Sequence, residues 1–279
     1  MIEIIKIVIL VLCVLCIVML YLIYPSVRKN PDRKRLQGLY IAHRGLHGLY
    51  EDIPENSLPA FSYAVEKGYP VEIDIRLTAD KKIVVFHDAS LKRMCGDARK
   101  PEECTLAELK ELSLKGTCHK IPTLKESLSV ISAKVPVLIE FKCADQSYKT
   151  LCVEADRILS EYKGDYFIQS FYPFVLWWYR KNRRDILRGQ LASTFRNRKK
   201  AGLAKKLLGC LVFNFIARPD FISYEYMYEK NIFRRICCRL GALPVGWTFR
   251  SRQELKKYNK CYEAWIFENF LPVRGNTNE

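Results

Sequence analysis

The stretch VEIDIRLTADKKIVVFHD, residues 71 to 88, decides how this part of the chain folds. Its two apolar runs are separated only by ADKK, whereas a parallel crossover needs a dozen or more residues, so the runs must form an antiparallel hairpin. The hairpin brings His87 close to Glu72 and Asp74. These two acids are two positions apart and therefore point to one face of the strand, where buried carboxylates require a cation.

Short β-type runs alternate with helical patterns along the rest of the chain. This βα rhythm is typical of a parallel sheet closed into a barrel, and ~250 residues suffice for one such barrel. We therefore expect an α/β fold, a TIM (β/α)8 barrel with an extra antiparallel hairpin strand. The expected strands are 39–43, 71–77, 136–141, 166–170, 187–191, 220–224, 243–248 and 264–267. The expected helices are 57–67, 123–133, 148–161, 226–239 and 251–259.

The N-terminus is strongly apolar. Residues 7–24 carry no charge, and with Ile4, Ile5 and a snorkelling Lys6 they are long enough to cross a bilayer, so they predict one transmembrane helix. A cleaved signal peptide is the competing interpretation, but the run exceeds the usual ~7 to 15 residues and lacks a small-x-small cleavage site. A buried core helix is the third interpretation.

Charge and cysteine usage indicate the compartment. The formal net charge of +16 favours an acidic partner, which could be nucleic acid, an anionic membrane or a phosphate-bearing substrate. Five bases follow the apolar helix within a dozen residues, so the positive-inside rule predicts a single-pass cell-membrane protein with a cytoplasmic body. The eleven cysteines are scattered and odd in number, which favours reduced thiols, and none has a spacing typical of zinc.

Residues 195–220 form a second unusual segment. Four bases between positions 196 and 200 and a Lys pair precede the apolar run 207–216, which is too short to cross a bilayer. The segment could be an interfacial element lying against anionic lipid, or an ordinary barrel helix with a solvated basic end.

Nine short motifs occur between residues 39 and 250, and in this order they resemble the glycerophosphodiester phosphodiesterase family, relatives of the phosphatidylinositol-specific phospholipases C. The motifs are HRG at 43–45, PENS at 54–57, EID at 72–74, T-x-D at 78–80, VVFHD at 84–88, IPTL at 121–124, IEFK at 139–142, QSF at 169–171 and WT at 247–248.

The resemblance implies a set of site residues. It implies one divalent metal held by three carboxylates, two histidines acting as general acid and base, and two bases that bind phosphate oxygens. An all-oxygen ligand set suits Mg²⁺ or Ca²⁺ rather than zinc, and imidazoles with a pKa near ~6.5 suit proton transfer. Which histidine starts as the base is left open. These residues are Glu72, Asp74 and Glu140 for the metal, His43 and His87 for proton transfer, and Arg44 and Lys142 for phosphate.

Several residues near the motifs have two interpretations. Glu55 resembles a family position near the glycerol and metal, but it could equally serve the start of a helix that Asn56 caps. Phe171 and Trp247 could wall the pocket or simply pack. Asp88 is expected to orient His87 or cap the next turn. His47 and His119 are expected to be structural, and Glu268 and Asn269 depart from the Thr-Asp pair that the family usually carries.

Together these patterns predict a transmembrane anchor at 1–27, a basic linker at 28–38 and a phosphodiesterase barrel at 39–279. The resemblance implies metal-dependent hydrolysis of glycerophosphodiesters to an alcohol and sn-glycerol 3-phosphate. A lysophospholipase D or phospholipase C-like activity on lipid would use the same residues, so a lysophospholipid is an alternative substrate. A non-catalytic module that binds anionic lipid is a further alternative. Nucleic acid is not expected as a partner, because no recognised binding motif accompanies the charge.

Overall fold

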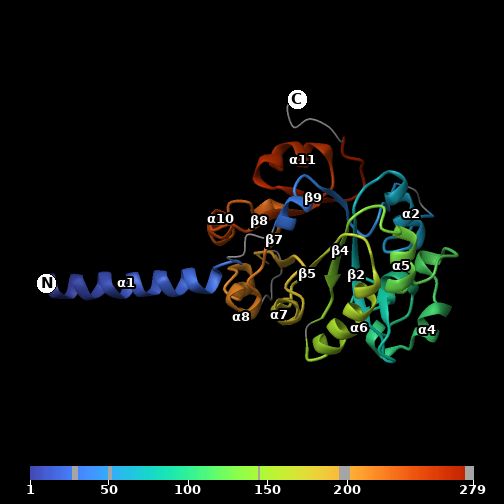
Figure 1. The fold of residues 1–279 in the computed structure, drawn as a ribbon, viewed down its shortest axis with the longest axis horizontal. Helices are drawn as coiled ribbons and strands as arrows, with labels where there is room; N and C mark the ends of the chain where they lie inside the picture. The colour runs from blue at the N-terminus through green and yellow to red at the C-terminus, as the bar shows by residue number, and fades with distance from the viewer. Residues whose placement is uncertain (27–30, 50–51, 144, 195–201, 274–279) are drawn as a thin grey trace.

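The computed structural model describes residues 1–26, 31–49, 52–143, 145–194 and 202–273. Its centre is a closed barrel of eight parallel strands, with β3 added as an antiparallel neighbour of β2 (Figure 1). Closure comes from the pairing of Ala42 in β1 with Val71 in β2. The strands are β1 (Tyr40–Ala42), β2 (Val71–Leu77), β3 (Ile83–Val85), β4 (Val137–Phe141), β5 (Tyr166–Ser170), β6 (Arg188–Ala192), β7 (Phe221–Glu225), β8 (Leu243–Phe249) and β9 (Ala264–Phe267).

The predicted TIM barrel and its extra hairpin strand are confirmed. Ile75 of β2 pairs with Val85 of β3, and the turn between them is closed by Thr78, whose hydroxyl donates to Asp80 at 2.6 Å. Beyond the paired part of β3, the amide of Phe86 still donates to the carbonyl of Asp74 at 2.8 Å. The chain therefore delivers the next residue, His87, to the same end of the barrel as the acids of β2.

Alternation along the strands separates the inside of the barrel from its outside. Ile73 and Ile139 point outward into the cluster that the strands form with the surrounding helices. Leu138 points inward and packs in a second apolar cluster with Leu36, which is fully buried. Glu140 is two positions after Leu138 and so lies on the same inward face, nearer the carboxyl end. The interior of the barrel is therefore apolar toward the amino ends of the strands and charged toward their carboxyl ends.

Helices cover the outside of the barrel, and 3-10 helices lie at 31–35, 101–103, 114–116, 226–228 and 259–261. The helices are α1 (Ile2–Ile23), α2 (Leu58–Glu66), α3 (Lys92–Cys95), α4 (Leu106–Glu111), α5 (Leu124–Ile131), α6 (Tyr148–Glu161), α7 (Pro173–Asn182), α8 (Leu203–Gly209), α9 (Asn214–Ala217), α10 (Ile232–Arg239) and α11 (Arg252–Tyr258).

Two expectations about helix starts were wrong. The helix expected over 226–239 begins only at Ile232, because the side chain of Asn231 caps it by accepting from the amide of Arg234 at 3.0 Å. Helix α2 is capped by Ser57 rather than by Asn56. Asn56 adopts a positive φ of 54° and turns its side chain toward β2 instead.

Helix α1 runs away from the barrel as a single rod (Figure 1). It has 22 residues, and none of its most apolar 18-residue window is buried against the protein. By length and composition it could cross a membrane, although a signal sequence near the N-terminus would meet the same criteria. Its lack of burial is opposite to what a core helix would show.

The end of α1 is joined firmly to the barrel. Ile23 is fully buried in a cluster with Leu211 and Ile222, and its carbonyl accepts from Asn214 Nδ2 at 2.9 Å. Arg218 adds a second contact, because its Nη1 donates to the carbonyls of Tyr21 and Tyr24 at 3.0 and 2.8 Å. The last turn of the rod is therefore part of the folded domain.

Part of the segment 195–220 packs at this junction between α1 and the barrel. Its basic residues 195–201 lie outside the described part of the chain, but the apolar part forms α8 and α9. Leu208, Leu211 and Val212 are buried against the barrel and α1, while Phe215 is partly exposed beside Tyr21. For residues 202–220 this packing favours the interpretation as barrel helices.

The joint predicts a difference between two N-terminal truncations. A chain starting at residue 20 keeps Ile23 and the three carbonyls bonded by Asn214 and Arg218, whereas a chain starting at residue 27 loses them. Burial of an isoleucine is worth ~1.5 to 3 kcal/mol and each hydrogen bond about 1 kcal/mol. We expect the shorter chain to melt at least about 5 °C lower by circular dichroism in the same detergent. Equal melting temperatures would contradict the joint.

Candidate active site

A cavity of about 250 Å³ opens at the carboxyl ends of the strands. It brings together most of the residues that the sequence singled out, from strands far apart in the chain. Asp74 lies just beneath it and is fully buried. The residues lining the cavity are His43, Arg44, Glu72, His87, Glu140, Lys142, Gln169, Phe171, Leu191, Trp247, Thr248, Arg250 and Ile266.

Three carboxylates form the floor of this cavity. Glu72 and Asp74 belong to β2, and Glu140 on the neighbouring β4 lies directly opposite Asp74 in the parallel register. One oxygen from each carboxylate lies within 4.8 Å of the others, and all three residues are buried. Adjacent strands of a parallel sheet hold such side chains at one level, so the fold itself produces the cluster.

The positive charge facing these acids comes from two bases. Lys142 Nζ lies 2.5 Å from Glu140 Oε1 and 3.1 Å from Asp74 Oδ1, and Arg44 Nε lies 3.4 Å from Asp74 Oδ2. Burial alone would raise the pKa of Asp74, but attraction to Lys142, then to His87 and Arg44, holds it below its usual value. Burial raises the pKa of Glu72 well above its usual value, and repulsion by Asp74 and Glu140 adds to this effect. The cluster therefore carries uncompensated negative charge when ionised.

The donor set of the cluster fits a hard divalent ion. Glu72 Oε1 is buried and accepts no hydrogen bond from any residue that the structure describes. Its other oxygen accepts from the amide of Arg44 at 3.1 Å, which aims the carboxylate at its neighbours. Three carboxylates without a nitrogen or sulfur ligand suit Mg²⁺ or Ca²⁺.

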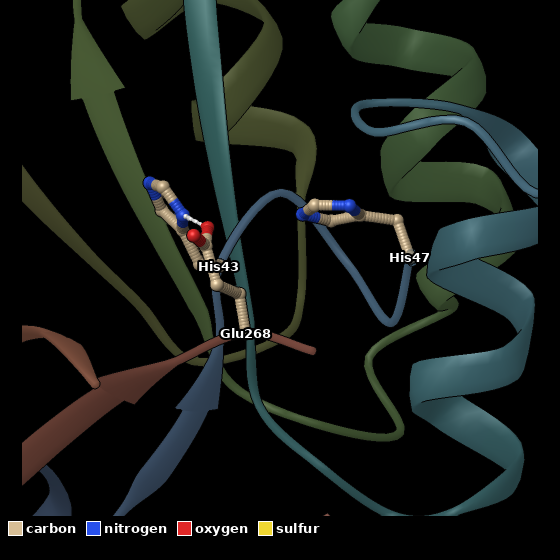
Figure 2. A group of neighbouring side chains, drawn as sticks. All are labelled: His43, His47 and Glu268. Carbon is tan, nitrogen blue, oxygen red and sulfur yellow. Dashed lines mark hydrogen bonds and ion pairs between the residues drawn. The ribbon is translucent and has the colours of Figure 1, made fainter. Parts of the chain in front are cut away.

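His43 follows β1 and is held by an acid from the far end of the chain. Its Nδ1 lies 2.5 Å from Oε2 of Glu268, which follows β9 (Figure 2). Burial alone would raise the pKa of Glu268, but the bond to His43 and attraction to Arg250 lower it to about 2. An ionised carboxylate can only accept, so His43 Nδ1 must carry the proton in this bond. In the neutral ring Nε2, on the side away from Glu268, keeps its lone pair.

His87 is oriented in a similar way. Its Nδ1 lies 2.7 Å from Asp88 Oδ1, and the contact expected between these two residues is thus present. Hydrogen bonds from Arg93 and His87 outweigh the effect of burial and lower the pKa of Asp88 to about 2. His87 therefore also donates from Nδ1. Burial lowers the pKa of His87 to about 4 in the absence of a bound ion, and burial likewise lowers the pKa of His43.

The side chain of Glu55 does not serve the start of helix α2. It binds two arginines, Arg44 Nη1 at 2.6 Å and Arg93 Nη2 at 2.7 Å. Burial would raise its pKa, but the hydrogen bonds from Arg93 and the attraction of Arg44 lower it to about 2. The next residue, Asn56, donates to Asp74 Oδ2 at 2.9 Å. The PENS motif therefore positions one base and one acid of the site.

The HRG motif has a steric reason for its glycine. Gly45 has a φ of 81°, and a Cβ at this position would lie 2.8 Å from the backbone of Ala60. The turn after β1 can therefore lie this close to α2 only with glycine. This turn places His43 and Arg44 at the mouth of the barrel.

Phe171 and Trp247 line one side of the cavity. Their rings meet edge to face, with centroids 5.9 Å apart at 89°. Trp247 also packs against the apolar cluster inside the barrel, so it serves both expected roles. Its indole nitrogen is buried and has no hydrogen-bond partner among the residues described.

Sequence reasoning missed four residues of the site. They are Asn56, Arg93, Arg250 and Glu268. For Glu268 a signal was present, because an acid directly follows the predicted last strand, as His43 follows the first. For Arg250, which lies 2.7 Å from Glu268, and for Arg93, which lies in the short helix α3, the pattern of the sequence gives no indication.

The sequence and the fold of this chain are similar to those of known proteins. Residues 43–271 match the model of the Glycerophosphoryl diester phosphodiesterase family. A glycerophosphodiester phosphodiesterase from Caldanaerobacter subterraneus is 33% identical over 151 residues, which are 50% of this chain and 61% of that protein. Lysophospholipase D GDPD1 from Rattus norvegicus is 29% identical over 156 residues, 51% of this chain and 48% of that protein. The chain thus spans about half the length of these relatives.

Solved structures share the fold over most of the chain. A phosphodiesterase from Oleispira antarctica, in complex with the product sn-glycerol-3-phosphate, has a TM-score of 0.68 at 24% identity, covering 84% of this chain and 94% of that one. A glycerophosphodiester phosphodiesterase from Thermotoga maritima has a TM-score of 0.62 at 27% identity, covering 82% and 94% of the two chains.

The ion pairs of Glu55 predict a pH-dependent contribution to stability. The pKa of Glu55 is lower in the folded chain than the usual 4.5, so its stabilising effect is complete above pH ~5 and is lost as the pH falls toward 2. The stability difference between the wild type and Glu55→Gln should shrink by about 2 kcal/mol from pH 7 to pH 3 in urea unfolding.

The matched control is Glu66→Gln, which removes an exposed carboxylate from α2. We expect this variant to differ little from the wild type at either pH. A difference for Glu55→Gln that is the same at pH 7 and pH 3 would contradict the role given to its ion pairs.

Proposed function

Because this chain belongs to the glycerophosphoryl diester phosphodiesterase family, we propose that it hydrolyses glycerophosphodiesters to an alcohol and sn-glycerol 3-phosphate. The observation that carries the proposal is the meeting of three acids, two oriented histidines and two bases in one cavity. A binding module would have no need to bury three carboxylates beside two imidazoles at large cost in desolvation.

The acids and the bases would have different roles in binding a phosphodiester. Glu72, Asp74 and Glu140 would hold one divalent ion, which when bound polarises a phosphoryl oxygen and offsets charge that develops on the phosphate. Lys142 and Arg44 line the same cavity and can donate to the remaining phosphate oxygens. Asn56 and Glu55 keep Asp74 and Arg44 in place.

Proton transfer falls to His43 and His87. One neutral imidazole takes the proton of the glycerol hydroxyl next to the phosphate, and that oxygen attacks phosphorus to form a cyclic phosphate. The other, protonated imidazole gives its proton to the oxygen of the departing alcohol. Water then opens the cyclic phosphate with the two roles reversed. Glu268 and Asp88 fix the ring proton on Nδ1 of each histidine, so that Nε2 performs the transfer.

A membrane location follows from α1. We propose that this helix spans the membrane with the barrel on the cytoplasmic side, because the bases cluster after the helix. The contacts of Arg218 and Asn214 with the end of the helix favour a retained anchor over a cleaved signal sequence, since cleavage would remove them.

The anchor also favours a second candidate substrate. A barrel joined directly to a membrane helix works at a surface where lysophospholipids are concentrated. A lysophospholipid presents the same glycerol phosphodiester with one acyl chain, and its hydrolysis to lysophosphatidic acid would use the same cavity residues. Phe171 and Trp247 supply an apolar wall next to the phosphate-binding groups.

The catalytic assignment predicts the behaviour of two variants. With the full chain in detergent, we expect release of sn-glycerol 3-phosphate from glycerophosphocholine or glycerophosphoethanolamine, lost with EDTA and restored by Mg²⁺ or Ca²⁺. His43→Ala and Glu72→Gln should each lower turnover at least about a hundredfold, as removal of a proton-transfer group or a metal ligand does.

Two matched variants control for nonspecific effects. His119→Ala and Glu66→Gln change a histidine and a glutamate outside the cavity and should leave turnover within about twofold. Activity that survives EDTA, or that persists in His43→Ala, would refute the assignment.

Product analysis separates the two substrate classes. In vesicles that contain both the full chain and lysophosphatidylcholine, the second candidate predicts that lysophosphatidic acid forms at a rate set by the surface concentration of the lipid. Turnover confined to soluble glycerophosphodiesters would exclude the lipid substrate. The readout is mass spectrometry of both products from one reaction.

A further inference from the structure

His47 is a histidine that the proposed reaction does not use. Its ring points toward the carboxylate of Glu268, which also holds His43 (Figure 2). Its Nε2 is buried and has no hydrogen-bond partner among the residues that the structure describes. A buried ring nitrogen without a partner is costly, so its position beside two other ligand-type groups requires an explanation.

The three side chains converge closely enough to share an ion. One ligand atom from each of His43, His47 and Glu268 lies within 4.8 Å of the others. A tetrahedral zinc ion with bonds of ~2.0 to 2.2 Å needs ligand atoms roughly 3.3 Å apart, so small side-chain movements would suffice. His43 Nδ1 and Glu268 Oε2 are 2.5 Å apart in their hydrogen bond, so these two atoms would have to separate slightly to share an ion.

Nδ1 of His43 carries the proton that it donates to Glu268, so a bound metal ion would replace that proton at Nδ1. Arg250 Nε binds the other oxygen of Glu268 at 2.7 Å, so the carboxylate is held in place with Oε2 facing His43.

We propose that His43, His47 and Glu268 form a second, inhibitory site for Zn²⁺. Two imidazoles and one carboxylate select zinc over Mg²⁺ or Ca²⁺, whereas the all-oxygen cluster of Glu72 selects the opposite. Glu55 and Glu268 near His47 attract a bound cation, whereas Arg44 and Lys115 oppose it. The two sites respond to different ions.

Inhibition follows from the geometry of His43 and rests on the proposed function. Zinc takes the lone pair of Nδ1 in place of the proton shared with Glu268, and the single proton of the neutral ring then resides on Nε2. With Nε2 protonated and Nδ1 bound to metal, His43 can no longer accept a proton from a substrate hydroxyl. Turnover therefore falls even when the carboxylate cluster is saturated with its own ion.

The activity test uses the full chain in detergent with saturating Mg²⁺ and chelator-buffered Zn²⁺. We expect zinc to inhibit the wild type, and His47→Ala to raise the zinc concentration for half-inhibition at least tenfold while turnover without zinc stays within twofold. His119→Ala is the matched control, because His119 lies beside Cys118 and could bind zinc elsewhere. Its inhibition should equal that of the wild type.

A binding test works without any substrate. With Mg²⁺ present, Co²⁺ should give visible absorption bands of a four- or five-coordinate ion without thiolate charge transfer, and these bands should be absent from His47→Ala and Glu268→Gln. Their presence in the wild type supports the site even if no phosphodiester is turned over. Their persistence in His47→Ala, or zinc inhibition equal to the wild type, overturns the proposal. Should His47→Ala fail to fold by circular dichroism, His47→Gln replaces it in both tests.

Discussion

The site depends on one electrostatic constraint, which is the burial of three carboxylates on two adjacent parallel strands. Glu72, Asp74 and Glu140 repel one another in a low-dielectric interior, and Lys142 and Arg44 offset only part of that charge. Such a cluster is stable only when cations converge on it, which explains why bases from the HRG and IEFK motifs point inward. The same convergence provides the groups that a phosphodiester needs.

Two further acids determine which ring nitrogen of each histidine carries the proton. Glu268 and Asp88 each accept from Nδ1 of a histidine, and each is itself held by an arginine, Arg250 or Arg93. This arrangement fixes the tautomer of both rings and leaves Nε2 for the proton transfer that we propose. It also places a carboxylate beside His47, which is the basis of the proposed zinc site.

Helix α1 and the barrel are firmly joined where the helix ends. The carbonyls at the end of α1 accept hydrogen bonds from Asn214 of α9 and from Arg218, which follows α9. Ile23 packs in an apolar cluster that includes Ile222 of β7. Residues 207–216, whose apolar character suggested lipid contact, are used mainly to build this junction. A short apolar run beside a transmembrane helix is ambiguous in sequence because burial against protein and contact with lipid require the same residues.

The sequence by itself determined the barrel, its hairpin strand and the pairing of Glu72 with Asp74 on one strand face, because strand periodicity sets the face and short connections dictate strand pairing. Only the tertiary structure decided which distant groups meet. Glu268 reaches His43 because β9 and β1 are neighbours in the closed sheet, and Arg93 reaches Glu55 from the short helix α3. Asn56 does not cap α2 as expected, and its side chain binds Asp74 instead. These partnerships depend on positions in space rather than on periodicity, so local patterns do not specify which side chains meet.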